Sequence, residues 1–483
     1  MLAKNIEYKT DILFVSNFLP LMDEIENEII YNLPENINYM FLTYKRTSIK
    51  NSYSYEEYVE KNFNKIIDYD ILELNMKYSD INLYTPIVCD RMISDYYMLE
   101  GVLGNKKYSY DEVNFIIKSW VMFLEEFIKN TKLVFSGYPD NLISHFTYIL
   151  ADFFHIKCLS YHPINLIKNT NYLSDDIYHK VYDKLIINEN SKTYTELIEY
   201  TEKANIKDLV RQEYKHSKGV EKPLFGIISP NLKKVNFWKY VFFGYQTENK
   251  EIKKYLEIDR VSFKNKFLGY LRRLYNIFTV KIYFAVNKHN LPEDMSGIIY
   301  FPLQVQPEAS TSVTSSLFMN LISTIELVSK SLPLGYLLVV KEHPMVKGTR
   351  NISFYKKIKS FSNVILVDTK YNGKYLIQNS ECIIGYGNTT LQESVMLGKK
   401  FFLLEDTFYS DSKLIRRLQD IKNMKNEILT LINKNFTEEE KKFEIQKMLN
   451  FFYQRGFPRY EDFEKNISKN LMRAYEIELL NKT

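Results

Sequence analysis

The chain has 483 residues, too many for one ordinary hydrophobic core, and this length favours two domains. Its 64 basic and 59 acidic residues leave a net charge of only +5, and no basic stripe with interleaved aromatics appears. We therefore expect no nucleic-acid partner. Three scattered cysteines without zinc-ligand spacing, no apolar signal segment and no uncharged apolar run of about 18 residues predict a cytoplasmic protein. Its weak positive charge would tolerate peripheral contact with the inner face of an anionic membrane.

The first half of the chain alternates predicted strands and helices. Apolar runs predict strands at residues 11–15, 39–44, 71–74, 133–136 and 156–160, and an extended segment at residues 83–89. Helical spacing of apolar residues predicts helices at residues 111–130 and 141–155. This alternation is typical of a parallel, doubly wound sheet. We expect residues 1–220 to form an N-terminal α/β domain.

The second half repeats the alternation after a less regular stretch. Residues 221–295 have weaker periodicity and more charge, which indicates a variable helical connection. Strands are then predicted at residues 299–303, 335–340, 363–367, 381–385 and 400–404. We therefore expect a second α/β domain over residues 296–440 and charged C-terminal helices over residues 441–483.

Residues 299–344 form the clearest strand, helix and strand unit. Hydroxyl residues over 310–314 are good helix N-caps, and apolar residues then recur at helical spacing: Val313, Leu317, Leu321, Ile325 and Val328. The two strands end in polar groups: Gln304, Gln306, Pro307 and Glu308 after the first, and Lys341, Glu342, His343 and Pro344 after the second. Because parallel strands end at one edge of a sheet, we expect these groups to form a ligand site there.

A glycine turn opens a later helix in the same domain. It contains Gly387, Asn388, Thr389 and Thr390. Hydroxyl groups and backbone N–H groups at a helix N-terminus suit a phosphate. Glu393, one turn later, would either bind ribose hydroxyls or lie on a solvated helix face.

Three blocks together resemble the capsule polysaccharide biosynthesis glycosyltransferases, a family that includes bacterial Kdo transferases. They are Gln306-Pro307-Glu308 after the strand at 299–303, His343-Pro344 after the next strand, and the glycine turn leading to Glu393. The resemblance is strongest over residues 299–405 and looser over residues 80–180. It implies a GT-B architecture: two doubly wound, Rossmann-like domains facing across a cleft, the donor on the C-terminal domain and the acceptor on the N-terminal one. Tyr386 departs from the threonine of many relatives.

The resemblance also implies an activity. A nucleotide-activated sugar, with a CMP-linked acidic sugar such as Kdo or a sialic-type acid as first candidate, would be transferred to a glycan or glycolipid of a bacterial surface polysaccharide. His343 would face the donor phosphate and Glu308 would lie beside the donor. Lys341 and the N–H groups before Thr389 would also stabilise the leaving phosphate without a metal ion. No cofactor besides the donor is expected.

Alternatives remain for several of these residues. An acceptor hydroxyl needs a base, and Asp140 and Asp90 are the candidates, although Asp90 would otherwise form an ion pair or a cap. His343 would otherwise bond a turn, and Glu308 would otherwise be a charge partner at a helix N-terminus. The rival functions on the same fold are a UDP- or CDP-dependent transferase, a nucleotide-sugar epimerase and a non-catalytic polysaccharide-assembly protein.

Overall fold

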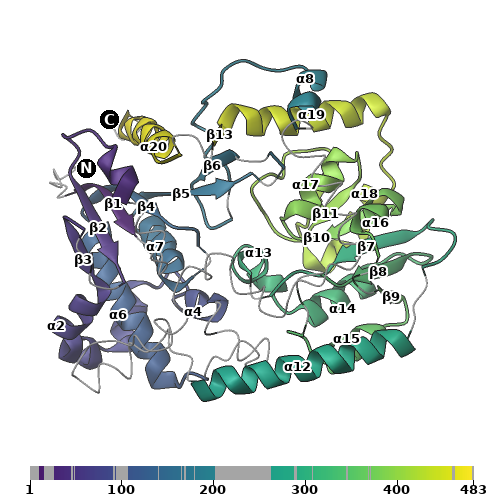
Figure 1. Ribbon diagram of the computed structural model, residues 1–483, viewed down its shortest axis with the longest axis horizontal. Coiled ribbons are helices and arrows are strands. Elements are labelled where there is room, and N and C mark those ends of the chain that lie inside the picture. Colours follow the sequence, from purple (N-terminus) through teal and green to yellow (C-terminus); the bar gives the residue numbers. More distant parts are fainter. Residues whose placement is uncertain are drawn as a thin grey trace.

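A computed structural model describes the chain apart from residues 1–9, 16–26, 45–46, 48, 91–92, 94–106, 140, 165, 168–169, 179, 202–262, 288–290, 307, 344–345, 347, 368, 370, 459–462 and 481–483. The described residues form two domains, each built on one β-sheet covered by helices (Figure 1). In both sheets the chain starts at a central strand, moves outward to one side, and then fills the other side. The expectation of two doubly wound, Rossmann-like α/β domains is confirmed.

The N-terminal sheet has the strand order β13-β6-β5-β4-β1-β2-β3. Its strands are β1 (Thr10–Val15), β2 (Tyr39–Thr43), β3 (Ser52–Ser54), β4 (Thr131–Ser136), β5 (Lys157–Pro163), β6 (Thr170–Ser174) and β13 (Phe457–Pro458). The strands from β5 to β3 are parallel, whereas β6 and β13 are antiparallel to their neighbours. The sheet is therefore mixed at one edge, where the sequence predicted only parallel strands.

Long helices cover one face of this sheet: α2 (Tyr55–Asp68), α6 (Tyr110–Ile128) and α7 (Leu142–Phe153). Helix α6 begins after Ser109, whose side chain accepts from the N–H of Glu112, while Glu112 accepts from the N–H of Ser109. Its buried Trp120 stacks on Tyr55 of α2, with ring centroids 3.7 Å apart. The helices predicted at residues 111–130 and 141–155 are thus confirmed.

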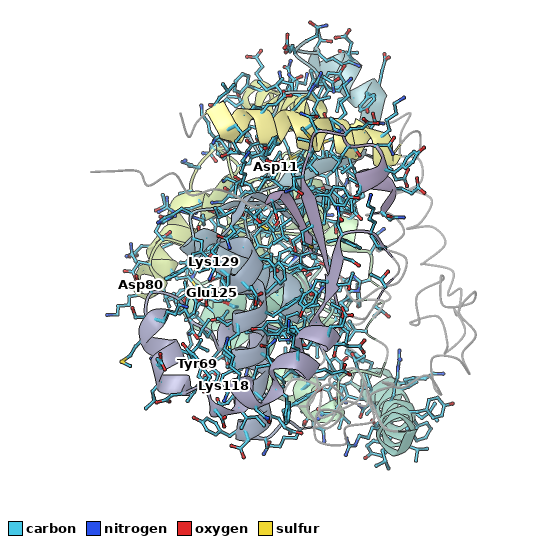
Figure 2. All side chains as sticks on the ribbon, turned by 90° about the vertical axis from the view of Figure 1, so that its left-hand side faces the viewer. Asp11, Tyr69, Asp80, Lys118, Glu125 and Lys129 are labelled. Atoms are coloured by element: carbon cyan, nitrogen blue, oxygen red, sulfur yellow. The ribbon has the colours of Figure 1, made fainter. Side chains whose placement is uncertain are left out.

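Polar contacts also tie α6 to its neighbours. Lys118 is 9% exposed and donates to the carbonyl groups of Ile67 and Tyr69 at the C-terminal end of α2, where the helix dipole favours a cation. Figure 2 shows Glu125 and Lys129 beside each other on α6, with their charged atoms 3.8 Å apart. The contacts of Lys118 therefore join α6 to α2, whereas the ion pair between Glu125 and Lys129 lies at the C-terminal end of α6.

Two segments that the sequence predicted as extended are helices. Residues 71–74 belong to α3 (Ile71–Lys77), which begins at Asp70 because that side chain accepts from the N–H of Leu72. Residues 85–89 form α4 (Thr85–Cys89), with Pro86 in the first turn, where its fixed φ suits a helix. Both predictions were wrong because a short segment rich in apolar residues does not distinguish a strand from a short helix.

The C-terminal sheet has six strands in the order β12-β11-β10-β7-β8-β9, and all neighbours are parallel. The strands are β7 (Ile298–Pro302), β8 (Leu337–Lys341), β9 (Val364–Val367), β10 (Cys382–Gly385), β11 (Phe401–Leu403) and β12 (Ile415–Arg417). Five of them confirm predicted strands, and β12 was not predicted. The five predicted strands are buried along almost their whole length, as expected for strands covered on both faces.

The single helix predicted over residues 313–328 is wrong. The chain instead forms α13 (Ala309–Ser312), a 3₁₀ turn η4 (Ser316–Phe318) and α14 (Leu321–Ser331). Asn320 interrupts the longer helix because its side chain accepts from the N–H of Ser323 and so caps α14. Leu317, expected on the buried face, is 77% exposed.

Further helices complete the C-terminal domain: α15 (Ile352–Lys359), α16 (Gly373–Asn379), α17 (Thr389–Met396), α18 (Met424–Ile432) and α19 (Glu438–Arg455). Helix α8 (Tyr194–Thr201) packs on α19. Helix α20 (Phe463–Leu480) returns to the N-terminal sheet, where Leu471 and Ala474 share a core with Phe14 (Figure 1). The chain therefore crosses from the first domain to the second and back.

Helix α12 (Phe263–Val286) is the longest described helix and packs on α15. It lies within the predicted connection, of which residues 221–262 are outside the described residues. None of the helices that the structure describes has the length and apolar character needed to cross a membrane.

Candidate functional site

The described residues predicted to bind the donor lie at the C-terminal edge of the second sheet. Strands β7 and β10 are neighbours there, and the chain leaves them toward opposite sides of the sheet. Ligands of doubly wound sheets bind outside the carboxyl ends of such a strand pair. Residues 303–306 and 308 follow β7, residues 342–343 follow β8, which ends at Lys341, and residues 386–390 follow β10 at this edge. The structure thus brings the described parts of the three sequence blocks to one edge.

A hydrogen bond joins the ends of the two central strands. The side-chain amide of Asn388 donates from Nδ2 to Oε1 of Gln304 at 2.6 Å. The Oδ1 of Asn388 accepts from the N–H of Thr390 at 2.9 Å and so caps α17. Gln304 is 5% exposed and donates from Nε2 to the carbonyl of Pro302 at 3.0 Å. The N-terminus of α17 is therefore fixed relative to the end of β7.

The glycine turn before α17 has a steric cause. A Cβ atom on Gly387 would lie 1.9 Å from Oγ1 and 2.1 Å from Cβ of Thr407, so only glycine fits there. Tyr386, the departure from the family pattern, is fully buried and donates from its hydroxyl to the carbonyl of Phe318 at 2.9 Å. Its ring belongs to the core beside α14, so this residue serves packing.

Glu342, directly after β8, is a buried carboxylate that the sequence placed at the ligand edge without a role of its own. It is 4% exposed, and Oε1 accepts from the backbone N–H of His343 at 2.6 Å and from Arg350. Oε2 accepts from the hydroxyl of Tyr355 at 2.7 Å. Burial, and then the nearby Glu342, raises the pKa of Tyr355 well above its usual value, so this hydroxyl stays a donor. The sequence contained one signal for a role of Glu342: this acidic residue follows almost directly on the apolar run of β8.

Arg350 extends this network to the neighbouring strand. One terminal nitrogen donates to Glu342 and the other to the backbone carbonyl of Gln304. Its guanidinium lies 4.8 Å from the ring centre of Phe354. Together with the bond between Gln304 and Asn388, these contacts join the ends of β8, β7 and β10. The backbone of the site is thereby held by buried polar side chains that no single sequence block contains.

His343 and Glu308 lie at this edge because β7 and β8 pair in register, with Pro302 opposite Lys341. His343 is partly exposed, and its backbone is held by Glu342. Glu308 is also partly exposed, and its Oε2 accepts from the hydroxyl of Ser310 at 3.3 Å beside the start of α13. The contact with Ser310 fits a helix N-terminal role, and the donor role of Glu308 stays a prediction.

The remaining predicted donor residues differ in their surroundings. Gln306 donates from Nε2 to the carbonyl of Met319 at 2.6 Å, and the buried Lys341 donates to the carbonyl of Glu342 at 3.2 Å. Thr389 is exposed at the first turn of α17, while Glu393 is partly buried near Tyr300, whose pKa is raised by burial and then by this carboxylate. Three predicted residues lie outside the described part of the chain: Pro307, Pro344 and Asp140.

Asp90, one of the two predicted bases, accepts two backbone hydrogen bonds. Its Oδ1 accepts from the N–H of Ile93 and its Oδ2 from the N–H of Leu142, both at 3.0 Å, and the residue is 7% exposed. The second bond caps α7 from the preceding α4. This geometry favours the capping interpretation that the sequence left open.

Glu405 is an acidic group that the sequence analysis missed. It follows β11 at the same sheet edge, and burial raises its pKa to about 7. The adjacent Asp406 forms a 2.8 Å ion pair with Lys180 of the N-terminal domain and also pairs with Arg417. Glu405 therefore lies beside a contact between the domains. A carboxyl group that titrates near neutral pH is suited to proton transfer.

The described residues contain no cluster of three or more His, Cys, Asp or Glu side chains arranged to hold a metal ion. The groups available at this edge are a histidine, a buried lysine, helix N–H groups and carboxylates. They are suited to binding an anionic ligand and to moving a proton.

No protein-family model and no curated protein matches the sequence. Solved structures are similar at low identity. A β-Kdo 2,7-transferase KpsC of Thermosulfurimonas dismutans is 11% identical, covering 76% of this chain and 97% of its own, with a TM-score of 0.31. The UDP-GlcNAc 2-epimerase of Neisseria meningitidis is 13% identical, with 96% of this chain and 100% of the epimerase covered and a TM-score of 0.23. The UDP-GlcNAc 2-epimerase of Methanocaldococcus jannaschii is 10% identical, with 92% of this chain and 99% of the epimerase covered and a TM-score of 0.26. These likenesses are distant, and the fold described above rests on the strand order of this chain.

Proposed function

We propose that the protein is a metal-independent glycosyltransferase that uses a nucleotide-activated sugar. The observation that carries this proposal is the network that joins the partly buried Asn388 to the buried Gln304, Arg350 and Glu342. This network links three strand ends and the N-terminus of α17 at the ligand edge of a doubly wound sheet. Such rigid support is what a site needs when it must stabilise charge that develops on a leaving phosphate.

In this proposal His343 and the first N–H groups of α17 bind the leaving phosphate, and Lys341 adds positive charge beneath them. Breaking a glycosidic bond to a nucleotide leaves negative charge on the phosphate, so groups that bind it more tightly in the transition state accelerate the reaction. Glu308 binds the sugar beside the phosphate. Glu405 or Asp140 accepts the proton of the acceptor hydroxyl, since Asp90 is engaged in capping α7.

The donor that we infer is a CMP-linked acidic sugar, and the acceptor is a glycan or glycolipid of a bacterial surface polysaccharide. Both follow from the resemblance of the three sequence blocks. The alternative donors are UDP- or CDP-sugars, the alternative reaction is epimerisation of a nucleotide sugar, and the non-enzymatic alternative is an assembly protein on the same fold.

Thermal-shift measurements with CMP, UDP, GDP and CDP test the proposal, because a ligand that binds only the folded state raises the melting temperature. We expect the largest rise with CMP. A rise with UDP alone favours the UDP-dependent transferase or the epimerase, and no rise with any nucleotide contradicts the proposed enzyme.

A matched pair of variants places the binding site. Asn388→Ala removes the cap of α17 together with its link to Gln304, whereas Asn372→Ala removes the similar cap of α16, which accepts from the N–H groups of Lys374 and Tyr375. Each loses about 1 kcal/mol of helix capping. Only Asn388→Ala should lose the nucleotide-induced rise in melting temperature. Equal losses in both variants would place the nucleotide elsewhere.

A further inference from the structure

Helix α12 has one face that packs on the C-terminal domain. Asn276 and Tyr283 are each 6% exposed on this face, and Asn276 donates from Nδ2 to the carbonyl of Gly348 at 3.2 Å. Gly348 has a positive φ of 79°, and a Cβ there would lie 2.6 Å from Ile277. The orientation of α12 about its axis is therefore fixed by close contacts with the loop before α15.

The opposite face of α12 is apolar and exposed. Its apolar stripe follows the helical spacing of three or four residues and consists of Leu268, Leu271, Tyr275, Phe278, Ile282 and Val286. In the described part of the chain, each of these six residues is between 40% and 76% exposed to solvent. From Leu268 to Val286 the stripe is about 27 Å long at ~1.5 Å per residue. Isolated exposed apolar residues are ordinary, whereas a continuous stripe of this length indicates a binding surface.

Positive charge borders the apolar stripe on both sides. Helical geometry places Arg272 along one side and Lys281 along the other, and both residues are exposed. The whole sequence of α12 contains no aspartate or glutamate. An amphipathic helix with aromatic and aliphatic residues on one face and only cations beside them is the pattern of helices that lie in the plane of an anionic membrane surface.

We propose that α12 binds the surface of an anionic lipid bilayer through its apolar stripe, lying in the headgroup region without crossing the membrane. Figure 1 shows α12 along one border of the molecule, beside α15 and away from the N-terminal sheet. The apolar side chains enter the boundary between headgroups and acyl chains, while Arg272 and Lys281 meet lipid phosphates. A second copy of the chain is the poorer occupant, because pairing two such faces would bring cations against cations.

The apolar stripe and its bordering cations belong to α12 alone, so membrane binding is independent of the proposed transferase activity. If both hold, the bilayer-bound helix keeps the enzyme at the surface that carries lipid-linked acceptors. The helix supplies the membrane affinity and the sheet edge supplies the chemistry.

Vesicle sedimentation tests the inference with the full-length protein. The probes are vesicles of phosphatidylcholine alone and vesicles that also contain phosphatidylglycerol. We expect binding to the anionic vesicles only, weakened by added salt because surface charges are screened. The double variant Leu271→Glu/Phe278→Glu should lower the partition coefficient by roughly tenfold or more, and Arg272→Gln/Lys281→Gln by a smaller factor.

The matched control is Leu72→Glu/Met76→Glu on α3, where both side chains are about as exposed as those of the apolar stripe. This control should bind vesicles like the wild type. Equal binding of neutral and anionic vesicles, or unchanged binding of the stripe variant, overturns the inference. If light scattering shows a dimer only when the apolar stripe is intact, the stripe binds a second copy of the chain instead. If the wild type does not bind vesicles and the stripe variant has a lower melting temperature, the stripe contacts residues 202–262 of the same chain instead.

Discussion

Arg350 and Glu342 form an ion pair in the interior of the C-terminal domain, with side chains that are 2% and 5% exposed. The pair joins the loop before α15 to the end of β8. Because Arg350 also donates to the carbonyl of Gln304, its removal affects two strand ends at once.

We predict that Arg350→Ala lowers the free energy of unfolding of the C-terminal domain by about 3–5 kcal/mol, since the carboxylate of Glu342 stays buried without its cation. Urea denaturation measures this loss. Tyr355→Phe removes only one neutral donor to the same carboxylate and should cost about 1–2 kcal/mol.

The double variant Arg350→Met/Glu342→Gln separates charge from packing. It removes both charges and should recover part of the stability lost in Arg350→Ala, because no buried ion remains unpaired. If the double variant is less stable than the single one, the ion pair is not the main contribution of these residues.

His343→Ala should reduce turnover by roughly a hundredfold, or about 2–4 kcal/mol of transition-state stabilisation, if His343 binds the leaving phosphate. Donor consumption and melting temperature are measured together. The melting temperature should change little because His343 is partly exposed at the sheet edge.

Two further variants complete this comparison. Glu308→Gln keeps the shape of the side chain and removes its charge, so a loss of turnover reports the charge alone. His155→Asn changes an exposed histidine that follows α7 and should leave turnover unchanged. Near-native turnover of His343→Ala, or a loss that only follows lost stability, returns His343 to a structural role.

Glu405 should make stability depend on pH near neutrality. Burial disfavours its ionised form and raises its pKa to about 7. The folded protein therefore loses stability as pH rises from the carboxyl group's ordinary range through about 7, and the loss is complete above that pH. Glu405→Gln removes this effect and should be more stable than the wild type at pH 8 by about 1 kcal/mol, a value reduced for solvent screening of a partly exposed group.

Melting curves of wild type and Glu405→Gln at pH 4.5 and pH 8 measure this difference. The two proteins should be alike at the lower pH and separate at the higher one, while the exposed variant Glu439→Gln shows no such separation. If Glu405 is also the base of the reaction, the turnover of the wild type rises with pH through about 7, and Glu405→Gln lacks this rise. A constant difference at both pH values contradicts the raised pKa.

Gly387→Ala should destabilise the C-terminal domain by ~2 kcal/mol or more, because the new Cβ overlaps Thr407. Gly373→Ala is the matched control: its Cβ would lie 3.7 Å from the hydroxyl of Tyr300, an ordinary contact at the start of α16. Thr407→Gly should restore much of the stability of Gly387→Ala. Equal stability of the two alanine variants would show that the turn has room for a side chain.

The sequence was sufficient for five of the six strands of the C-terminal sheet because these strands are short, continuous apolar runs, such as Cys382–Gly385, that need no distant partner to be noticed. The prediction of a strand at residues 71–74 was wrong because Asp70 caps the N-terminus of a helix there. Prediction from the sequence also failed around Asn320, a single cap that divides an otherwise regular apolar pattern. Local hydrogen bonds by single side chains override periodicity in both cases.

The candidate site was predictable only in part. Its location followed from the rule that parallel strands end at one edge, so His343 and Asn388 could be assigned to the same region. Arg350 could not, because its role depends on a loop that brings it back to Glu342 and Gln304. Glu405 could be noticed as an acid after a strand, but its raised pKa depends on burial that only the folded chain creates.

The return of α20 and β13 to the N-terminal sheet has a consequence for biosynthesis. Phe457 pairs with Asn171 of β6, and Leu471 shares a core with Phe14. While the ribosome is still making the second domain, the first one therefore has an open strand edge and an uncovered apolar face. Such surfaces attract other strands and chaperones. The N-terminal domain is translated first, but it can complete its sheet and its core only after residues 457–480 have been synthesised.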